Sequence, residues 1–155
     1  MDANKFNIKY FVIITLITSI WINISEIFRY DVFVVPKMKS FFDNKEGVVG
    51  MNLKIFAIWG FWDTLLTAIL VFIFWLYSRT FGNSLSSIFT ASTLVWLSVF
   101  VIFWIATANM GLADWNMLWI ALPLSWIEMF VGAFIASKLY KKLENEELKN
   151  SIYSN

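Results

Sequence analysis

The sequence predicts an all-α integral membrane protein, built as a bundle of four transmembrane helices. Of its 155 residues, 59% are hydrophobic and 19% aromatic, whereas only 15% are charged. Soluble domains carry about 25% charged residues, so this chain has more apolar surface than a water-exposed fold can bury. Four separate stretches are also long enough for a membrane helix, which needs about 20 mostly apolar residues.

Charged or turn-forming segments separate the four predicted spans. In chain order the spans cover residues 10–28, 53–77, 85–108 and 115–137. The first span follows Lys5 and Lys9 as the apolar part of a signal peptide would, but Glu26 and Arg29 take the place of a cleavage site of small residues. It is therefore predicted to be a retained helix.

The four spans form one predicted membrane domain, residues 1–142, which a polar C-terminal tail follows at residues 143–155. The segment VFVVPKMKSFF, residues 32–42, lies between the first two spans. We interpret it as an interfacial segment with Lys37 and Lys39 at the lipid headgroups. The alternative is an outward continuation of the first helix that Pro36 stops.

The distribution of basic residues predicts the orientation of this multi-pass protein. With four spans, both termini lie on one side of the membrane. The side of the termini carries Lys5, Lys9, Arg79, Lys138, Lys141, Lys142 and Lys149. The opposite side carries Arg29, Lys37, Lys39, Lys45 and Lys54. Because cytoplasmic loops carry the excess of Lys and Arg, both termini are predicted to be cytoplasmic.

The absence of cysteine and histidine closes several chemistries to this chain. It excludes a thiol–disulfide oxidoreductase, haem held by His or Cys, a zinc site built on imidazoles, and a Ser–His nucleophile. The chain has no glycine-rich phosphate loop, and its net charge of +1 gives no reason to expect nucleic-acid binding. We therefore predict no cofactor and no metal, assign no catalytic residue, and favour a role other than that of an enzyme.

The first span carries its polar residues on one face. Thr15, Ser19, Asn23 and Glu26 are spaced by four, four and three residues, which places them along one side of a helix. Lipid satisfies none of these groups, so the face should point to protein or to a watered cavity. For Thr15 and Ser19, hydrogen bonds between packed helices explain the pattern. For Glu26, the alternative to a functional role is an ion pair with Arg29 near the membrane surface.

The second span has an acid near the middle of the membrane. Asp63 follows Leu53 by ten residues, and so lies about 15 Å into the span. Trp59, Gly60 and Thr67 share its face. A charged side chain there costs about 2.5–3.5 kcal/mol on insertion scales, and is by default a functional hypothesis. The alternative is a neutral Asp63 that bonds a neighbouring hydroxyl as part of helix packing.

The third span is uncharged and is interpreted as a packing helix, although its Trp104 could form the wall of a pocket. The fourth span places Ser125, Glu128 and Gly132 on one face. Glu128 follows Trp115 by 13 residues, about 20 Å into the span. Gly132 is explained by close approach to another helix.

These faces predict a cavity open to the outside, with acids at its base and tryptophans as its walls. Asp63 and Glu128 are expected near one membrane level and Glu26 nearer the outer surface, with Arg29 at the outer mouth. The predicted ligand-binding residues are Asn23, Glu26, Trp59, Trp62, Asp63, Trp104, Ser125, Trp126 and Glu128. The alternative for the tryptophans is anchoring at the membrane interface, where Trp is enriched.

Three functions remain open at this point. The first is binding or carriage of a small lipophilic or cationic molecule in the intramembrane cavity. The second is a structural or accessory subunit, whose partner would be another membrane protein or a second copy of the chain. The third is an acid/base enzyme acting on a membrane-dissolved substrate. In each case the lipid bilayer is the surrounding partner.

Overall fold

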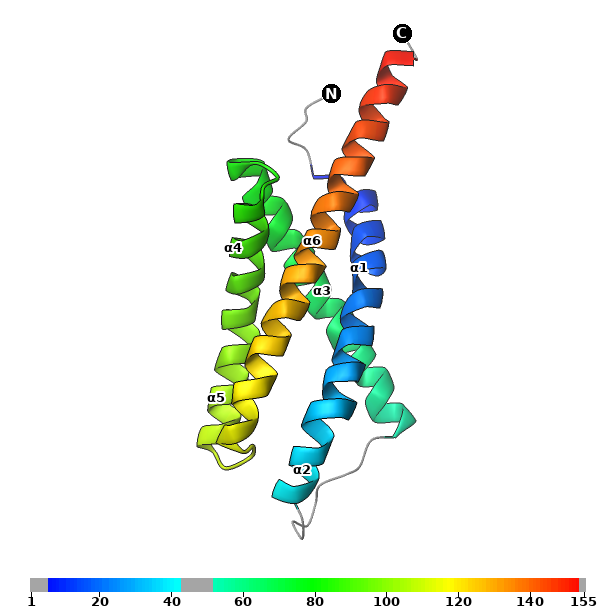
Figure 1. Cartoon of the computed structure of the whole chain (residues 1–155). Helices are drawn as coiled ribbons and strands as arrows, with labels where there is room; N and C mark the ends of the chain where they lie inside the picture. Colours follow the sequence, from blue (N-terminus) through cyan, green and yellow to red (C-terminus); the bar gives the residue numbers. More distant parts are fainter. Residues whose placement is uncertain (1–5, 43–51, 154–155) are drawn as a thin grey trace.

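The fold is a bundle of four long helices, as the sequence predicts (Figure 1). The structure is a computed structural model that describes residues 6–42 and 52–153, and over these residues it contains helices and short turns but no strand. In chain order the helical elements are α1 (Ile8–Arg29), η1 (Tyr30–Val34), α2 (Val35–Phe41), α3 (Leu53–Phe81), α4 (Leu85–Trp96), η2 (Leu97–Val101), α5 (Ile102–Asn109) and α6 (Trp115–Tyr153). The elements η1 and η2 are single π-helical turns within longer helices.

The first helix is longer than predicted. Elements α1, η1 and α2 form one helix, Ile8–Phe41, so the segment interpreted as interfacial continues the first helix in line (Figure 1). Pro36 does not stop it. A proline ring clashes with the carbonyl four residues earlier in an α-helix, here that of Val32, and Val32 lies in the π-helical turn η1. The wider backbone of that turn makes room for the proline.

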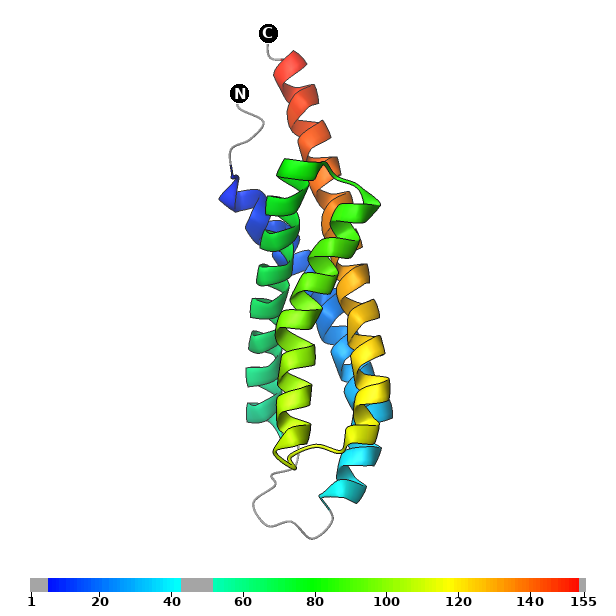
Figure 2. The same ribbon diagram turned by 90° about the vertical axis from the view of Figure 1, so that its left-hand side faces the viewer.

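Each helix of the bundle has two main neighbours. Helix α1 packs against α3 and α6, and α4 packs against the same two helices on the other side (Figures 1 and 2). The described ends of the chain and the α3–α4 turn lie at one end of the bundle, and α2 and the α5–α6 turn lie at the other (Figure 1). Each of these turns contains a glycine with a positive φ, Gly82 at 81° and Gly111 at 72°, a conformation that glycine adopts without strain.

The centre of the bundle is tightly packed apolar side chains from α1, α3, α4 and α6. A Cβ atom at Gly132 would lie 3.0 Å from Ile22 Cδ1 of α1 and 3.0 Å from Leu70 Cδ2 of α3. Ile22 and Leu70 are themselves fully buried. Gly132 therefore allows α6 to approach both helices, as the sequence predicts.

Hydrogen bonds between helices come from different residues than expected. Ser19 Oγ donates to the Leu16 carbonyl of its own helix at 2.9 Å, so its predicted role in joining helices is wrong. Thr15 Oγ1 is buried and has no hydrogen-bond partner among the described residues. Helices α4 and α6 are instead joined by hydrogen bonds from two indole N–H groups. Trp96 donates to the Leu122 carbonyl at 2.8 Å, and Trp126 donates to Thr93 Oγ1 at 3.1 Å.

The last helix continues well past the bundle. Helix α6 has 39 residues and includes Pro123, and its last turns project beyond the ends of the other helices (Figure 1). The polar tail predicted at residues 143–155 is helical as far as Tyr153, where the described part of the chain ends.

Candidate functional site

Three acids from three different helices are buried inside the bundle. They are Glu26 of α1, Asp63 of α3 and Glu128 of α6, with exposed fractions of 8%, 6% and 1%. Each lies on the polar face that the helical spacing predicts. Because lipid cannot solvate a carboxylate, turning all three acids inward is the arrangement that a membrane helix requires.

Arg29 is the one basic side chain that the bundle buries, among the residues described. The spacing suggested an ion pair with Glu26, and the guanidinium does form a hydrogen-bonded ion pair with that carboxylate. It also lies between helices, because Arg29 Nε is 3.6 Å from Glu128 Oε2 of α6. Arg29 is only 3% exposed, so the expectation that it lies at the outer mouth is wrong. Its guanidinium carbon is also 5.5 Å from the centre of the Phe100 ring of η2.

Glu128 is attached to α1 by two further contacts. Ser25 Oγ donates to Glu128 Oε2 at 3.1 Å, and Trp21 Nε1 donates to the Glu128 backbone carbonyl at 3.2 Å. The other carboxylate oxygen, Oε1, is buried and accepts no hydrogen bond from any described residue. Glu128 is therefore held in place by one oxygen while its second oxygen remains unsatisfied, which is unfavourable for a buried polar atom.

Asp63 and Glu26 line a pocket between α1 and α3. Its volume is about 110 Å³. The lining residues are Asn23, Glu26, Ile27, Tyr30, Asp31, Phe56, Trp59, Gly60 and Asp63. The Asp63 backbone carbonyl accepts a hydrogen bond from Thr67 Oγ1 at 2.6 Å, whereas its carboxyl group accepts none from the described residues. The Tyr30 and Trp59 rings, with centres 6.1 Å apart, join the two helices beside the pocket.

The pocket and the ion pairs meet at Glu26. Glu26 lines the pocket together with Asp63. Its carboxylate pairs with Arg29, and Arg29 in turn reaches Glu128. Glu128 itself does not line the pocket. The structure therefore brings Asn23, Glu26, Asp63 and Trp59 of the predicted site together directly, and connects Glu128 to them only through Arg29.

The other predicted tryptophans lie elsewhere. Trp62 is 60% exposed on the outer surface of the bundle. Trp126 stacks on Phe130 at 5.4 Å between ring centres and bonds Thr93, so it belongs to the α4–α6 contact. Trp104 packs against the apolar core. Ser125 is buried and donates to the Leu122 carbonyl of its own helix at 2.9 Å. None of the four lines the pocket.

Sequence reasoning missed Tyr30, Ser25 and Phe100. Tyr30 could have been found, because it follows Asn23 by seven residues and so lies two helical turns along the same face. Ser25 and Phe100 carried no such signal. Both belong to the charge cluster through contacts between helices. Ser25 donates to Glu128 of α6, and the Phe100 ring of η2 lies against the guanidinium of Arg29.

The site holds more acid than base and suits positive charge. If all four side chains were ionised, Glu26, Asp63 and Glu128 would carry three negative charges against the one positive charge of Arg29. No group of three His, Cys, Asp or Glu residues close enough to hold a metal ion occurs within the described ranges. With all four side chains ionised, this cluster would therefore carry a net negative charge, and the only buried cation among the described residues is Arg29.

The sequence matches no family model and no curated protein, and the fold matches no solved structure.

Proposed function

We propose that the protein binds a small cation, or the cationic group of a small lipophilic molecule, in the pocket between α1 and α3. One observation carries the proposal: among the described residues the bundle buries three acids but only one basic side chain, and two of these acids, Glu26 and Asp63, line the pocket. A buried ion is stable only when it is paired. Since Arg29 already pairs with Glu26, a cation beside Asp63 would supply the positive charge that this acid lacks.

The walls of the pocket favour the same kind of ligand. Tyr30, Phe56 and Trp59 line it, and aromatic faces attract ammonium groups with about 0.5–2 kcal/mol. Asn23 lines the same pocket as the two acids. Its amide nitrogen donates to the Ser19 carbonyl at 2.8 Å, which leaves the amide oxygen to accept a hydrogen bond from a ligand.

The size of the pocket limits what it can hold. Its volume is about 110 Å³. That is room for three or four water molecules at about 30 Å³ each, whereas pockets for drug-sized ligands measure roughly 300–1,000 Å³. The ligand group inside the pocket is therefore an ammonium or methylammonium-sized cation. Any larger lipophilic part would extend past Phe56 and Trp59, which are exposed at the rim.

The proposed orientation places this pocket toward the outside of the cell. With Arg29 buried in the bundle, three basic residues of the described ranges, Lys37, Lys39 and Lys54, belong to the end away from the termini. Six described basic residues belong to the end of the termini, namely Lys9, Arg79, Lys138, Lys141, Lys142 and Lys149, so the bias in charge is larger than the sequence alone suggests. Both termini are then cytoplasmic, and the pocket residues Asp31 and Phe56 lie toward the outer surface.

The test is binding of radiolabelled methylammonium to the detergent-purified protein by equilibrium dialysis. Asp63→Asn removes the unpaired acid of the pocket with little change in shape, and we expect at least a tenfold loss of binding. Asp114→Asn is the matched control, because Asp114 bonds Asn116 near the start of α6, away from the pocket. Circular dichroism confirms that both variants are folded. Equal binding by wild type and Asp63→Asn, or no binding of ammonium, methylammonium or tetramethylammonium by wild type, would refute the proposal.

A further inference from the structure

A second charged feature lies on α6 at the point where this helix leaves the apolar core. The apolar core reaches Tyr140, which is buried, and Leu143, which packs against it. Beyond that point α6 continues without other helices around it (Figure 1). Lys138, Lys141 and Lys142 lie on the exposed side of α6 where the core ends, and Lys149 lies on the projecting part. All four side chains are exposed. We call these four residues the lysine face.

The lysine face continues a stripe of exposed apolar residues along the same side of α6. Ile127 and Phe134 are exposed at 50% and 39%, and they are two helical turns apart. Lys138 lies one helical turn after Phe134, and Lys141 lies two turns after Phe134. Lys138 Nζ lies 5.1 Å from the centre of the Phe134 ring. An exposed apolar stripe on a membrane helix faces lipid tails, so the point where it becomes basic marks the level of the headgroups.

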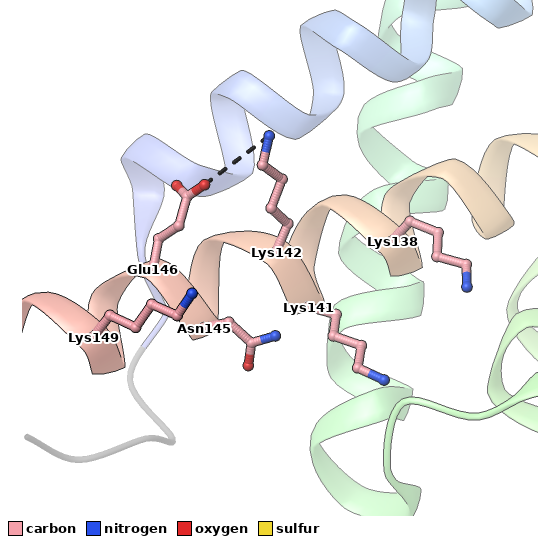
Figure 3. Close-up of a pocket in the computed structure, with 6 residues that line it drawn as sticks. All are labelled: Lys138, Lys141, Lys142, Asn145, Glu146 and Lys149. Carbon is pink, nitrogen blue, oxygen red and sulfur yellow. Dashed lines mark ion pairs between the residues drawn. The ribbon is translucent and has the colours of Figure 1, made fainter.

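The arrangement of the side chains leaves an open basic surface. In Figure 3, Lys142 extends from one edge of the helix beside Glu146, Lys149 lies across the near side, and Lys138 and Lys141 point toward the other edge. Between them is a shallow hollow of about 450 Å³. Glu146 is the one acid that lines it, and this carboxylate is 4.0 Å from Lys142 Nζ. Four lysines against one glutamate leave an excess of three positive charges on this face.

The other acids of the segment do not cancel this charge. Glu144 points to α3, where Oε1 lies 2.5 Å from Arg79 Nη2. Glu147 is about half a turn from Lys149 around the helix at about 100° per residue, and so lies on the opposite side from the lysines.

We propose that the lysine face binds the phosphate groups of anionic phospholipids, in the membrane leaflet at the end of the bundle where the termini lie. The charge is complementary, and the exposed stripe of Ile127 and Phe134 places the lysines at headgroup depth. Lysine suits this position because its aliphatic stem lies along apolar surface while its ammonium group reaches phosphate. This proposal is independent of the cation-binding pocket.

The experiment measures the association of spin-labelled phosphatidylglycerol, relative to spin-labelled phosphatidylcholine, with the full chain in phosphatidylcholine vesicles by electron paramagnetic resonance. We expect the anionic lipid to be preferred at low salt and the preference to weaken at 0.5 M NaCl, because ions screen exposed charges. In the variant Lys138→Gln/Lys141→Gln the preference should fall by about fivefold to thirtyfold, as about 1 kcal/mol for each of one or two juxtamembrane lysines implies.

The matched control is Lys39→Gln/Lys54→Gln, which makes the same change in net charge at the opposite end of the bundle. Its lipid preference should equal that of wild type. An unchanged preference in the lysine-face variant, or an equal fall in the control, would overturn the proposal. Soluble glycerol 3-phosphate distinguishes a lipid site from a site for free phosphate esters. If it displaces the anionic lipid at millimolar concentration, the assignment to membrane lipid is wrong.

Discussion

Arg29 provides the sharpest test of the buried charge cluster. The substitution Arg29→Met keeps a long, unbranched side chain and removes the positive charge. Glu26 then loses its hydrogen-bonded partner, and Glu128 loses the guanidinium 3.6 Å from its Oε2. Breaking a buried ion pair by removing one partner costs about 3–5 kcal/mol. The lost contact with Phe100 adds about 0.5–2 kcal/mol.

We therefore expect Arg29→Met to lower the free energy of unfolding by about 4 kcal/mol. The measurement is equilibrium unfolding in mixed micelles, by titration with sodium dodecyl sulfate and detection by far-ultraviolet circular dichroism. Adding Glu26→Gln to Arg29→Met should recover most of the loss, since it removes the carboxylate that was left without a partner. Glu128→Gln alone should be nearly neutral, because it reduces the excess of acid over base.

The control is Lys142→Met, which breaks the pair of Lys142 with Glu146 on the surface. Both side chains of that pair are more than half exposed, at 72% and 56%. Exposed pairs contribute little, so the change should stay within about 0.5 kcal/mol. A loss below 1 kcal/mol for Arg29→Met would refute the reasoning. So would a double variant Arg29→Met/Glu26→Gln that is no more stable than Arg29→Met.

Three further predictions follow from the packing, the pocket and the orientation. Gly132→Val should destabilise the bundle by about 1–3 kcal/mol in the same unfolding assay, because the added carbons overlap side chains of α1 and α3. Trp59→Leu should weaken methylammonium binding about threefold to thirtyfold, whereas Trp62→Leu should leave it unchanged because Trp62 does not line the pocket. Equal losses in both variants would count against the proposed wall. In the cysteine-free chain, Ser86→Cys should react with a membrane-impermeant maleimide only from the cytoplasmic side and Met110→Cys only from outside, and the reverse pattern would invert the proposed orientation.

The inward-facing positions of the three buried acids are predictable from the sequence, whereas the positions of the tryptophans are not. Glu26, Asp63 and Glu128 face inward because lipid cannot solvate them, so their helical spacing alone indicates which sides of α1, α3 and α6 meet. Tryptophan carries no such constraint, since an indole is stable against lipid tails and against protein. Trp59 and Trp62 are only three residues apart, yet one lines the pocket and the other is 60% exposed to the outer surface.

Two expectations for the first helix are corrected by its actual length and backbone geometry. The segment around Pro36 is interpreted as interfacial, with a helix that Pro36 stops as the alternative. Instead the first helix continues through it, because a π-helical turn before Pro36 removes the steric conflict, and no pattern in the sequence specifies that turn. Arg29 is expected at the outer mouth, next to a predicted span that ends at residue 28. Since the helix continues to Phe41, Arg29 lies twelve residues before its end, and its charge must be met inside the bundle.

The two π-helical turns set which residues of the first and third membrane-spanning helices can face the centre of the bundle. Each π-helical turn contains one residue more than the α-helical turn that it replaces. Because an α-helix turns about 100° per residue, removing that residue would rotate the following part of the helix by about 100° relative to the part before it. Element η1 begins directly after Arg29, and η2 contains Phe100, which lies over the guanidinium of Arg29. Deletion of one residue from η1 would restore an ordinary α-helix and turn the whole of α2 to a different side relative to Arg29. The chain is thus sensitive at these two places to changes in length, even where it would accept changes in residue type.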